Sequence, residues 1–325
     1  MKKIAIIGAF IFLTICLTII GCLSDWKGGE GTLTITLGGD SNGRAVDWPP
    51  YFDDPVKFRY PMTYIITIDG PVGTIEEKFS FSEDDLLENV KFTFFVIAGR
   101  WNVNIKAYVT DKGKFLYSTG DSNVSIKAGQ INSVGIKMNK AYYDIGDYGP
   151  GGGKIFHVDP RGFTLYLDKD DKTGIIAYYL EVAPTYYSVP DAGGDIFKWA
   201  DYGTSLYEKN IDTSEEIGTG RKNTYLIISI DAGAPAANAC INYTNNGKDD
   251  WFLPSKGEII VLWENRESVN FRPSSSCTVW SSSQVDNNDT DAHGLNVYSS
   301  GIDYSITIST FNKSYDGFVY PIRAF

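Results

Sequence analysis

The sequence predicts an all-β sandwich followed by a domain of mixed α and β structure. Three observations on the 325-residue chain support this prediction. Residues 31–139 contain short stretches in which apolar and polar residues alternate, the pattern of half-buried antiparallel strands. From about Lys140 this alternation weakens, and aspartate, glycine and tyrosine become frequent. Residues 31–139 carry 11 basic and 13 acidic residues, whereas residues 140–325 carry 15 and 25, so we place the domain boundary at 139/140.

The first residues predict export. A basic "MKK" precedes the apolar run "IAIIGAFIFLTICLTII", and the small residue Gly21 stands directly before Cys22. Signal peptides have this order and end at small residues. "IIGC" resembles the lipobox of bacterial lipoproteins, which implies that residues 1–21 are a signal peptide and that Cys22 carries a thioether-linked lipid and an amine-linked acyl chain such as palmitate. The alternative is a plain N-terminal transmembrane anchor, for which about 20 apolar residues suffice.

The expected mature chain begins with a polar tether, residues 22–30, and several acyl chains would hold it stably at the membrane. Leu23 and Ser24 follow the cysteine in place of the acidic residue that often retains lipoproteins at the inner membrane. This favours the outer membrane and the cell surface. Without the signal peptide the chain has 27 basic and 40 acidic residues, a net charge of −13, which argues against nucleic acid as a partner.

Seven stretches of the first domain are candidate strands. In "GTLTITL", Leu33, Ile35 and Leu37 alternate with threonines, and "WNVNIKAY" alternates in the same way. The other candidates are "TYIITID", "KFTFFVI", "KFLYS", "NVSIKAG" and "INSVGIKM", separated in part by the turns "DGPVG", "IAGRW" and "DKGK". So many short strands predict a sandwich of the immunoglobulin-like or prealbumin-like kind. The pattern resembles β-sandwich modules that lie beside the lipid anchor in spirochaete-type surface lipoproteins.

The second domain opens on a glycine-rich stretch and continues into two helices. "YGPGGGKIF" has Tyr148 and Ile155 where a phosphate-binding P-loop has glycine and Ser or Thr, so it predicts a flexible turn into a strand. One helix is expected near residues 222–230. A second is expected in "APAANACINY", with Pro235 in its first turn, where the missing N–H is tolerated.

The stretch "DDWFLPSKGEI" has the composition of an active site, but its spacing predicts a helix start. Ser255 precedes Glu258 by three residues, which is the spacing of a capping box. Pro254 and Ile259 stand at the positions of a hydrophobic staple. Backbone amides would then engage both the hydroxyl and the carboxylate, so the two groups are expected to be structural.

Residue types used in catalysis occur in this domain, but not in catalytic patterns. Asp249 and Asp250 are adjacent, and adjacent residues of an extended chain point to opposite faces. "TVWSSSQ" predicts a strand around Trp280, and no G-x-S-x-G elbow accompanies its serines. His157 and His293 are the two histidines of the chain, and no C-x-x-C motif suggests zinc. We therefore predict that the protein is not an enzyme.

"DNNDTDAHG", residues 286–294, is the best candidate for a ligand-binding loop. Its side-chain oxygens alternate as calcium ligands do, and Asp289 and Asp291 are the expected ligands of a calcium ion. An EF-hand would need glycine and glutamate where the chain has Ala292 and Tyr298. The alternative is a solvated hairpin loop. The candidate ligand-binding residues are Asp286, Asn287, Asp289, Asp291, His293 and Tyr298.

Two cysteines remain once Cys16 leaves with the signal peptide and Cys22 carries lipid. Cys240 and Cys277 can form a disulfide in an exported protein, because disulfides persist outside the cytosol. The alternative is a pair of buried, unlinked thiols.

Several motifs of the second domain occur together in a known family. They are "IGDYGPGGGKIFHVD", "YLEVAP", "GTSL", "IGTGRKNT", "DDWFLPSKGEI", "VWSSSQ" and "YPIRAF", and they span residues 144–325. In this order they resemble the C-terminal domain of Legionella collagen-like adhesins and the Fibrobacter succinogenes major paralogous domains, and more distantly the formylglycine-generating enzymes. The resemblance implies a C-type-lectin-like fold. It also implies framework roles for Trp251, Leu253, Pro254, Glu258, Trp280 and Arg323, to which the capping-box spacing adds Ser255.

The chain departs from these relatives in two ways. Residues 301–325 contain no cysteine pair of the kind that formylglycine-generating enzymes use, and no collagen repeat is present. The adhesins are associated with sulfated polysaccharides, which a domain with a net charge of −10 would repel without a basic patch or bound calcium.

These observations lead to three hypotheses of function. The first is a lipid-anchored, adhesin-like surface protein whose second domain binds a glycan or a host-surface ligand without catalysis. The second is an envelope protein that binds a protein partner, and the third is an enzyme acting on surface polysaccharides. For the first, the candidate stacking faces are Trp199, Tyr202, Tyr298 and Tyr304, which are otherwise core or half-buried strand residues.

Overall fold

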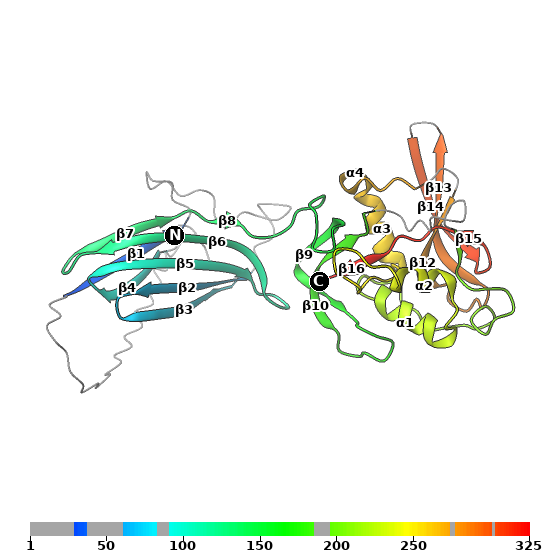
Figure 1. The fold of residues 1–325 in the computed structure, drawn as a ribbon, viewed down its shortest axis with the longest axis horizontal. Coiled ribbons are helices and arrows are strands. Elements are labelled where there is room, and N and C mark those ends of the chain that lie inside the picture. Colours follow the sequence, from blue (N-terminus) through cyan, green and yellow to red (C-terminus); the bar gives the residue numbers. More distant parts are fainter. Residues whose placement is uncertain (1–28, 38–60, 83–90, 185–195, 274–276, 301–302) are drawn as a thin grey trace, which may run out of the picture.

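The computed structural model describes residues 29–37, 61–82, 91–184, 196–273, 277–300 and 303–325. The fold is rich in β-structure and consists of two lobes that lie end to end (Figure 1). The expected signal peptide, the lipidation site Cys22 and most of the tether lie outside the described residues. Within the described ranges, no helix has the length and apolar character needed to cross a membrane.

Two β-sheets form the first lobe. One sheet has the order β4–β1–β7, in which β1 is antiparallel to β4 and parallel to β7. The other sheet is antiparallel and has the order β3–β2–β5–β6–β8. The strands are β1 (Glu30–Leu37), β2 (Met62–Gly70), β3 (Gly73–Phe81), β4 (Lys91–Ile97), β5 (Gly99–Val109), β6 (Phe115–Ile126), β7 (Ile131–Ile136) and β8 (Asn139–Lys140).

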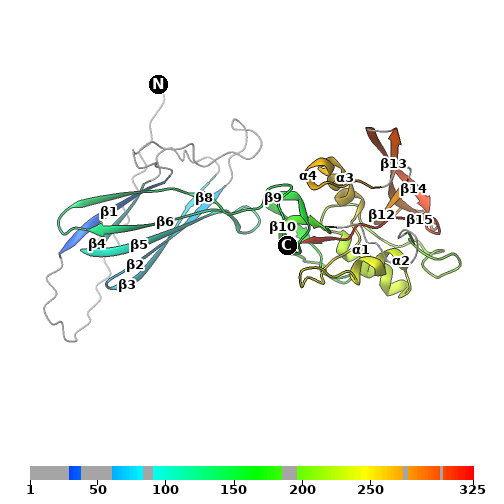
Figure 2. The same cartoon turned by 45° about the horizontal axis from the view of Figure 1, so that its top comes forward.

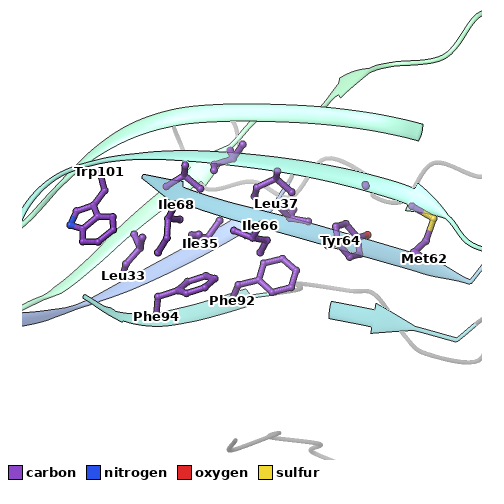
Figure 3. Packing of buried hydrophobic residues seen from close by; sticks show 14 of the residues in the cluster. Leu33, Ile35, Leu37, Met62, Tyr64, Ile66, Ile68, Phe92, Phe94 and Trp101 are labelled. Carbon is purple, nitrogen blue, oxygen red and sulfur yellow. The ribbon is translucent and has the colours of Figure 1, made fainter. Parts of the chain in front are cut away.

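The alternation seen in the sequence places every second side chain between the two sheets. Leu33 and Ile35 of β1 and Ile66 of β2 are fully buried. Figure 3 shows them gathered with Phe92 and Phe94 of β4 in the space between the strands. The first lobe is therefore sandwich-like, with one continuous apolar core.

Three strands of the first lobe differ from the sequence prediction, and one of them is the two-residue β8, which was not predicted. β3 was not predicted, because it is an edge strand on which Glu76, Glu77 and Lys78 are exposed and obscure the alternation. "KFLYS" and "NVSIKAG", predicted as separate strands, belong to the single strand β6. It passes without a break through Gly120, where a Cβ atom would lie 2.7 Å from the Lys137 carbonyl oxygen.

The second lobe combines small sheets with short helices. Its sheets have the orders β16–β10–β9, β11–β15 and β12–β13–β14. Their strands are β9 (Lys154–Leu165), β10 (Ile175–Val182), β11 (Phe197–Lys198), β12 (Cys277–Gln284), β13 (Asp291–Ser300), β14 (Asp303–Asn312), β15 (Asp316–Gly317) and β16 (Ile322–Ala324). The helices are α1 (Gly220–Ile230), α2 (Pro235–Ile241), α3 (Lys256–Glu264) and α4 (Arg266–Val269).

The C-terminal end of the chain lies in the same sheet as the first strand of the second lobe. The last strand, β16, pairs with β10, which in turn pairs with the lobe's first strand β9. The backbone amides of Tyr178 and Tyr179 donate to the carbonyl of the C-terminal Phe325 at 2.8 and 3.0 Å. Helices α1 and α2 lie where the sequence predicted them, with Pro235 at the start of α2.

The two lobes meet where the end of β6 approaches β9 and β10 (Figure 2). Aromatic side chains fill this junction. The Phe115 ring of β6 lies 5.4 Å from the ring of Tyr178 and 5.7 Å from that of Tyr179, both in β10. Tyr179 stacks on Phe325 at 5.0 Å, and Tyr142 of the connecting segment lies 5.8 Å from Phe115. The two lobes thus share an apolar contact.

Candidate functional site

Ser255 and Glu258 are buried and form the capping box at the start of α3. The Ser255 amide donates to Glu258 Oε2 at 2.7 Å, and the Glu258 amide donates to Ser255 Oγ at 3.2 Å. Glu258 Oε1 also accepts from the Gly218 amide at 2.9 Å. Burial raises the pKa of Glu258 to about 7. Although this pKa would suit a general acid, the carboxylate points at its own backbone and is 0% exposed.

Glu258 also fixes the start of α1. A Cβ atom at Gly220, the first residue of α1, would lie 2.2 Å from Glu258 Oε2. Only glycine allows the helix to begin this close to the carboxylate. The opening of α1 and the opening of α3 are therefore arranged around one buried acid.

The glycine-rich loop holds an internal carboxylate. The amides of Gly153 and Gly151 donate to the Glu181 carboxylate at 2.7 and 3.1 Å. Arg323 donates to the same carboxylate at 3.1 Å and to both oxygens of Asp250 at 2.8 and 3.0 Å. The loop amides, which could bind a phosphate, are thus occupied by Glu181, and Asp250 is held by a bidentate ion pair.

The three consecutive serines of β12 are fully buried and have structural partners. Ser281 Oγ donates to the His293 carbonyl at 2.8 Å, and Ser283 Oγ donates to the Ser214 carbonyl at 2.9 Å. Ser282 Oγ accepts from the Asn223 side chain at 3.2 Å. These contacts join β12 to β13, to segment 212–219 and to α1, and none of the three serines is presented to an open site.

The residues expected to have framework roles are all buried: Trp251, Leu253, Pro254, Ser255, Glu258, Trp280 and Arg323. Trp280 donates its indole N–H to the Phe197 carbonyl at 2.8 Å. The proposal that Trp199 offers a stacking face is wrong, because Trp199 is buried and its indole N–H donates to the Ser281 carbonyl at 2.9 Å. Tyr202 is exposed, and nothing is described of the Tyr304 side chain.

The loop 285–290 connects β12 to β13 as a hairpin, and residues 291–294 of "DNNDTDAHG" belong to β13. The predicted ligand residues do not all meet there. Asp286, Asn287 and Asp289 are exposed at its tip. Asp291 accepts from the side chains of Asn288 and Thr290 at 3.0 and 3.2 Å. Tyr298 stands seven residues further along β13, about 23 Å away at ~3.3 Å per residue.

His293 faces α3 instead of the loop. Its Nε2 lies 2.9 Å from Glu215 Oε1, and the Lys256 ammonium donates to Glu215 Oε2 at 2.7 Å. Burial, followed by the nearby Lys256 charge, lowers the pKa of His293, which keeps the ring neutral near neutral pH. The three side chains link segment 212–219 to the start of α3.

Within the described ranges, no group of three or more His, Cys, Asp or Glu side chains gathers as a metal site. The predicted calcium ligands Asp289 and Asp291 lie beside a lysine instead: the Lys313 ammonium donates to the Asp289 carbonyl at 2.6 Å. A calcium ion at Asp289 and Asp291 stays a prediction.

The disulfide between Cys240 and Cys277 is not formed, which corrects that expectation. Cys240 of α2 belongs to the apolar cluster around Trp199, whereas Cys277 at the start of β12 packs against a different cluster around Leu262. Burial raises the pKa of the Cys277 thiol to about 11 and that of the Cys240 thiol well above its ordinary value. Both groups are therefore unreactive thiols.

An open cleft of about 470 Å³ is the candidate site of the second lobe. Its wall comes from the β5–β6 hairpin, strand β9, segment 212–219 and helix α1. The lining residues are Lys112, Phe163, Thr164, Tyr166, Asp212, Ser214, Glu216, Ile217, Thr219, Lys222 and Asn223. Sequence reasoning missed this cleft, because these residues share no motif and Lys112 comes from the other lobe.

The cleft presents the half-buried Tyr166 ring, and protein partners hold the polar groups behind it. The Lys222 ammonium lies 4.8 Å from the centre of the Tyr166 ring and donates to the Asp171 carbonyl at 3.1 Å. The Asn223 amide group is locked by two hydrogen bonds with the Ser214 backbone, at 3.0 and 2.7 Å.

The charged residues at the edge of the cleft are exposed to solvent. They are Lys112, Asp212 and Glu216, so both signs of charge are present. Asp212 and Glu216 are the carboxylates of the cleft, and their exposure does not provide the desolvation that a general acid needs. The arrangement can bind a polar ligand by stacking and hydrogen bonding.

No protein-family model matches this chain, and a search of curated proteins finds no matching sequence.

Proposed function

We propose that this protein is a lipid-anchored surface protein that binds a glycan in the cleft beside Tyr166, without catalysis. The observation that carries the proposal is the cleft itself, which combines the half-buried Tyr166 ring with the exposed polar side chains of Asp212 and Glu216. A volume of about 470 Å³ falls in the range typical of small-ligand sites, ~300–1,000 Å³. Aromatic faces attract the C–H edges of sugars, and the hydroxyls can pair with the polar groups around them.

In this proposal the second lobe is a head with a C-type-lectin-like fold, related to the C-terminal domain of the collagen-like adhesins. The first lobe is a stalk of the immunoglobulin-like or prealbumin-like kind. Lipid at Cys22 attaches the stalk to the outer membrane and places the head at the cell surface. The mixed charge of the cleft suits a neutral or weakly charged saccharide better than a highly sulfated one.

The absence of catalysis in this proposal rests on how the reactive side chains are used. Glu258, Asp250 and Glu181 are engaged by backbone amides or by Arg323. The serines of β12 are buried, with Ser281 and Ser283 bonded to backbone carbonyls and Ser282 to the Asn223 side chain. A polysaccharide-cleaving activity would need two carboxyl groups of contrasting environment, whereas Asp212 and Glu216 share an exposed one.

A protein partner in the envelope is the second candidate, and it is favoured by an apolar patch on the stalk. Phe95 of β4 and Ile131 of β7 flank Thr32 of β1 on the outer face of their sheet. Their side chains are 76% and 77% exposed. Large exposed apolar side chains that lie together often mark protein contacts.

The test is a glycan-array screen of the full chain, repeated with calcium and with a chelator. We expect binding to a limited set of saccharides in both conditions. Tyr166→Ala should weaken that binding about tenfold through the loss of stacking, as measured by calorimetric titration. Tyr315→Ala, which removes an exposed ring outside the cleft, is the matched control and should leave the affinity unchanged.

Two outcomes would contradict the proposal. One is silence on the array in both conditions, and the other is equal affinity of wild type and Tyr166→Ala. Capture of a stoichiometric envelope protein that is lost in Phe95→Ser would favour the second candidate instead.

A further inference from the structure

Lys313 is a buried cation in the second lobe, whose net charge is negative. It follows directly after β14 and is 0% exposed. Lysine is almost never fully buried unless its charge is compensated. The compensation here comes mainly from backbone carbonyl groups.

The Lys313 ammonium uses all three of its protons on three separate points of the chain. It donates to the carbonyls of Asp289 at 2.6 Å, Leu206 at 2.9 Å and Lys209 at 3.0 Å. The ring of Trp199 lies 4.9 Å away and adds a cation–π contact. An ammonium has three donors and no acceptor, so this set of oxygens satisfies it completely.

The main chain of the same residue ties the same segments together. The Lys313 amide donates to the Thr290 carbonyl at 2.8 Å, and its own carbonyl accepts from the Ala200 amide at 3.0 Å. Two successive residues of the hairpin loop 285–290 are thus held by Lys313.

The surroundings of the ammonium have the character of a cation site. Backbone carbonyl oxygens are ligands for metal cations in proteins. Burial lowers the pKa of Lys313 to about 8, and the charges of Asp289 and Asp291, the residues predicted as calcium ligands, act in the opposite direction and favour the ammonium. The side chain therefore brings a positive charge to the place where the loop would otherwise require a bound ion.

We propose that the Lys313 ammonium is the built-in cation of this carbonyl site and orders the loop 285–290 in place of a metal ion. The loop is then independent of calcium. Truncation of the lysine should open a site for a small free cation of the alkylammonium class. This proposal does not depend on glycan binding in the cleft, which lies among other residues.

The experiment compares full-length wild type, Lys313→Ala and Lys313→Met by amide hydrogen exchange of residues 286–290. Each is measured with chelator, with calcium chloride, with propylammonium chloride and with sodium chloride at equal ionic strength. Propylammonium restores the atoms that Lys313→Ala removes. Lys169→Ala is the matched control, because Lys169 is an exposed lysine on another loop.

In wild type we expect the same slow exchange with chelator and with calcium. Lys313→Ala should speed exchange of the loop about tenfold or more, because three charge-assisted hydrogen bonds are lost. Propylammonium should reverse this increase and sodium should not. Should Lys313→Ala fail to fold, Lys313→Met keeps the apolar stem without the charge and should show the same increase.

Three results would overturn the proposal. They are a loop in wild type that calcium slows about tenfold, exchange in Lys313→Met equal to that of wild type, and a folded Lys313→Ala that propylammonium does not restore. A faster loop in Lys169→Ala would count against it too, because the effect would then be one of net charge.

Discussion

At the scale of single residues, burial and hydrogen bonding compete on Glu258. Backbone amides of Ser255 and Gly218 donate to its carboxylate and favour the charged form. Complete burial disfavours that form more strongly, and the pKa rises from 4.5 to about 7. A carboxyl group whose pKa is higher in the folded state binds protons more tightly there. Its contribution to stability is therefore full below pH 4.5 and is lost as the pH rises to about 7.

Glu258→Gln tests this behaviour. The variant cannot titrate, and its amide NH₂ would face backbone N–H donors, so we expect a loss of about 2 kcal/mol in the free energy of unfolding. Between pH 5 and 7, wild-type stability should fall more steeply than that of the variant, by ~1 kcal/mol per pH unit. Urea unfolding at a series of pH values measures both. Glu264→Gln, on the exposed side of α3, is the control, and parallel pH profiles for wild type and Glu258→Gln would refute the assignment.

At the scale of elements, a buried ion-pair network joins β10 and β16 to two loops. Glu181 of β10 receives the glycine-loop amides, and Arg323 of β16 bridges it to Asp250. The close approach is strict at Gly153, where a Cβ atom would lie 1.9 Å from the Val182 carbonyl oxygen. The network fixes the turn that leads into β9.

Arg323→Lys should break this arrangement while keeping the charge. A lysine has no planar fork and cannot bind Asp250 through two donors while reaching Glu181. We expect a loss of about 2–4 kcal/mol in the free energy of unfolding, since a buried charge is left poorly paired. Arg272→Lys, which alters an exposed pair with Glu267, should change stability by less than about 0.5 kcal/mol. Chemical denaturation of both variants gives the comparison, and similar small losses would show that the network adds little.

Elements with local signals could be predicted from the sequence, and those without them could not. The capping box of α3 depends on Ser255 and Glu258, three residues apart, so spacing alone revealed it. β3 was missed because solvent, not the core, surrounds most of its side chains. The turn character of "YGPGGGKIF" was predicted, but its partner Glu181 lies 28 and 30 residues away from the loop glycines.

At the scale of the whole molecule, an aromatic junction joins the two lobes. Tyr179 stacks on Phe325 and contacts Phe115 from the first lobe. Lys112, which lines the cleft, reaches the head from the same side of the first lobe, in the β5–β6 hairpin. Because Lys112 belongs to the first lobe, the cleft keeps all of its lining residues only while the junction holds the two lobes together.

Tyr179→Ala should uncouple the two lobes. We expect calorimetry to show separate unfolding transitions and small-angle scattering to show a larger radius of gyration, because the variant loses the ring contacts that bridge the junction. The head should lose about 2 kcal/mol of stability from the removed aromatic packing. Tyr202→Ala, an exposed ring far along the chain from the junction, should leave both measurements unchanged. One unfolding transition with an unchanged radius in Tyr179→Ala would show that the junction is not what couples the lobes.

Much of the candidate site lay beyond sequence reasoning for a physical reason. A cleft is a property of surfaces brought together, and this one combines residues from Lys112 to Asn223 with no shared spacing. The loop 286–294, by contrast, was conspicuous because its polar residues are consecutive. Its exposed tip and the distant Tyr298 show that a dense polar run need not converge on one ligand.

The sequence by itself determined the features that depend on near neighbours. These are the alternating strands of the first lobe, the positions of α1 and α2, and the helix start at Ser255. Only the tertiary structure decided what the polar residues do, because their partners are far away along the chain: Arg323 meets Glu181 across 142 positions, and Lys313 meets the Leu206 carbonyl across 107. It also separated Cys240 from Cys277 and opened the cleft, since both depend on how distant segments pack and not on the order of residues in any one of them.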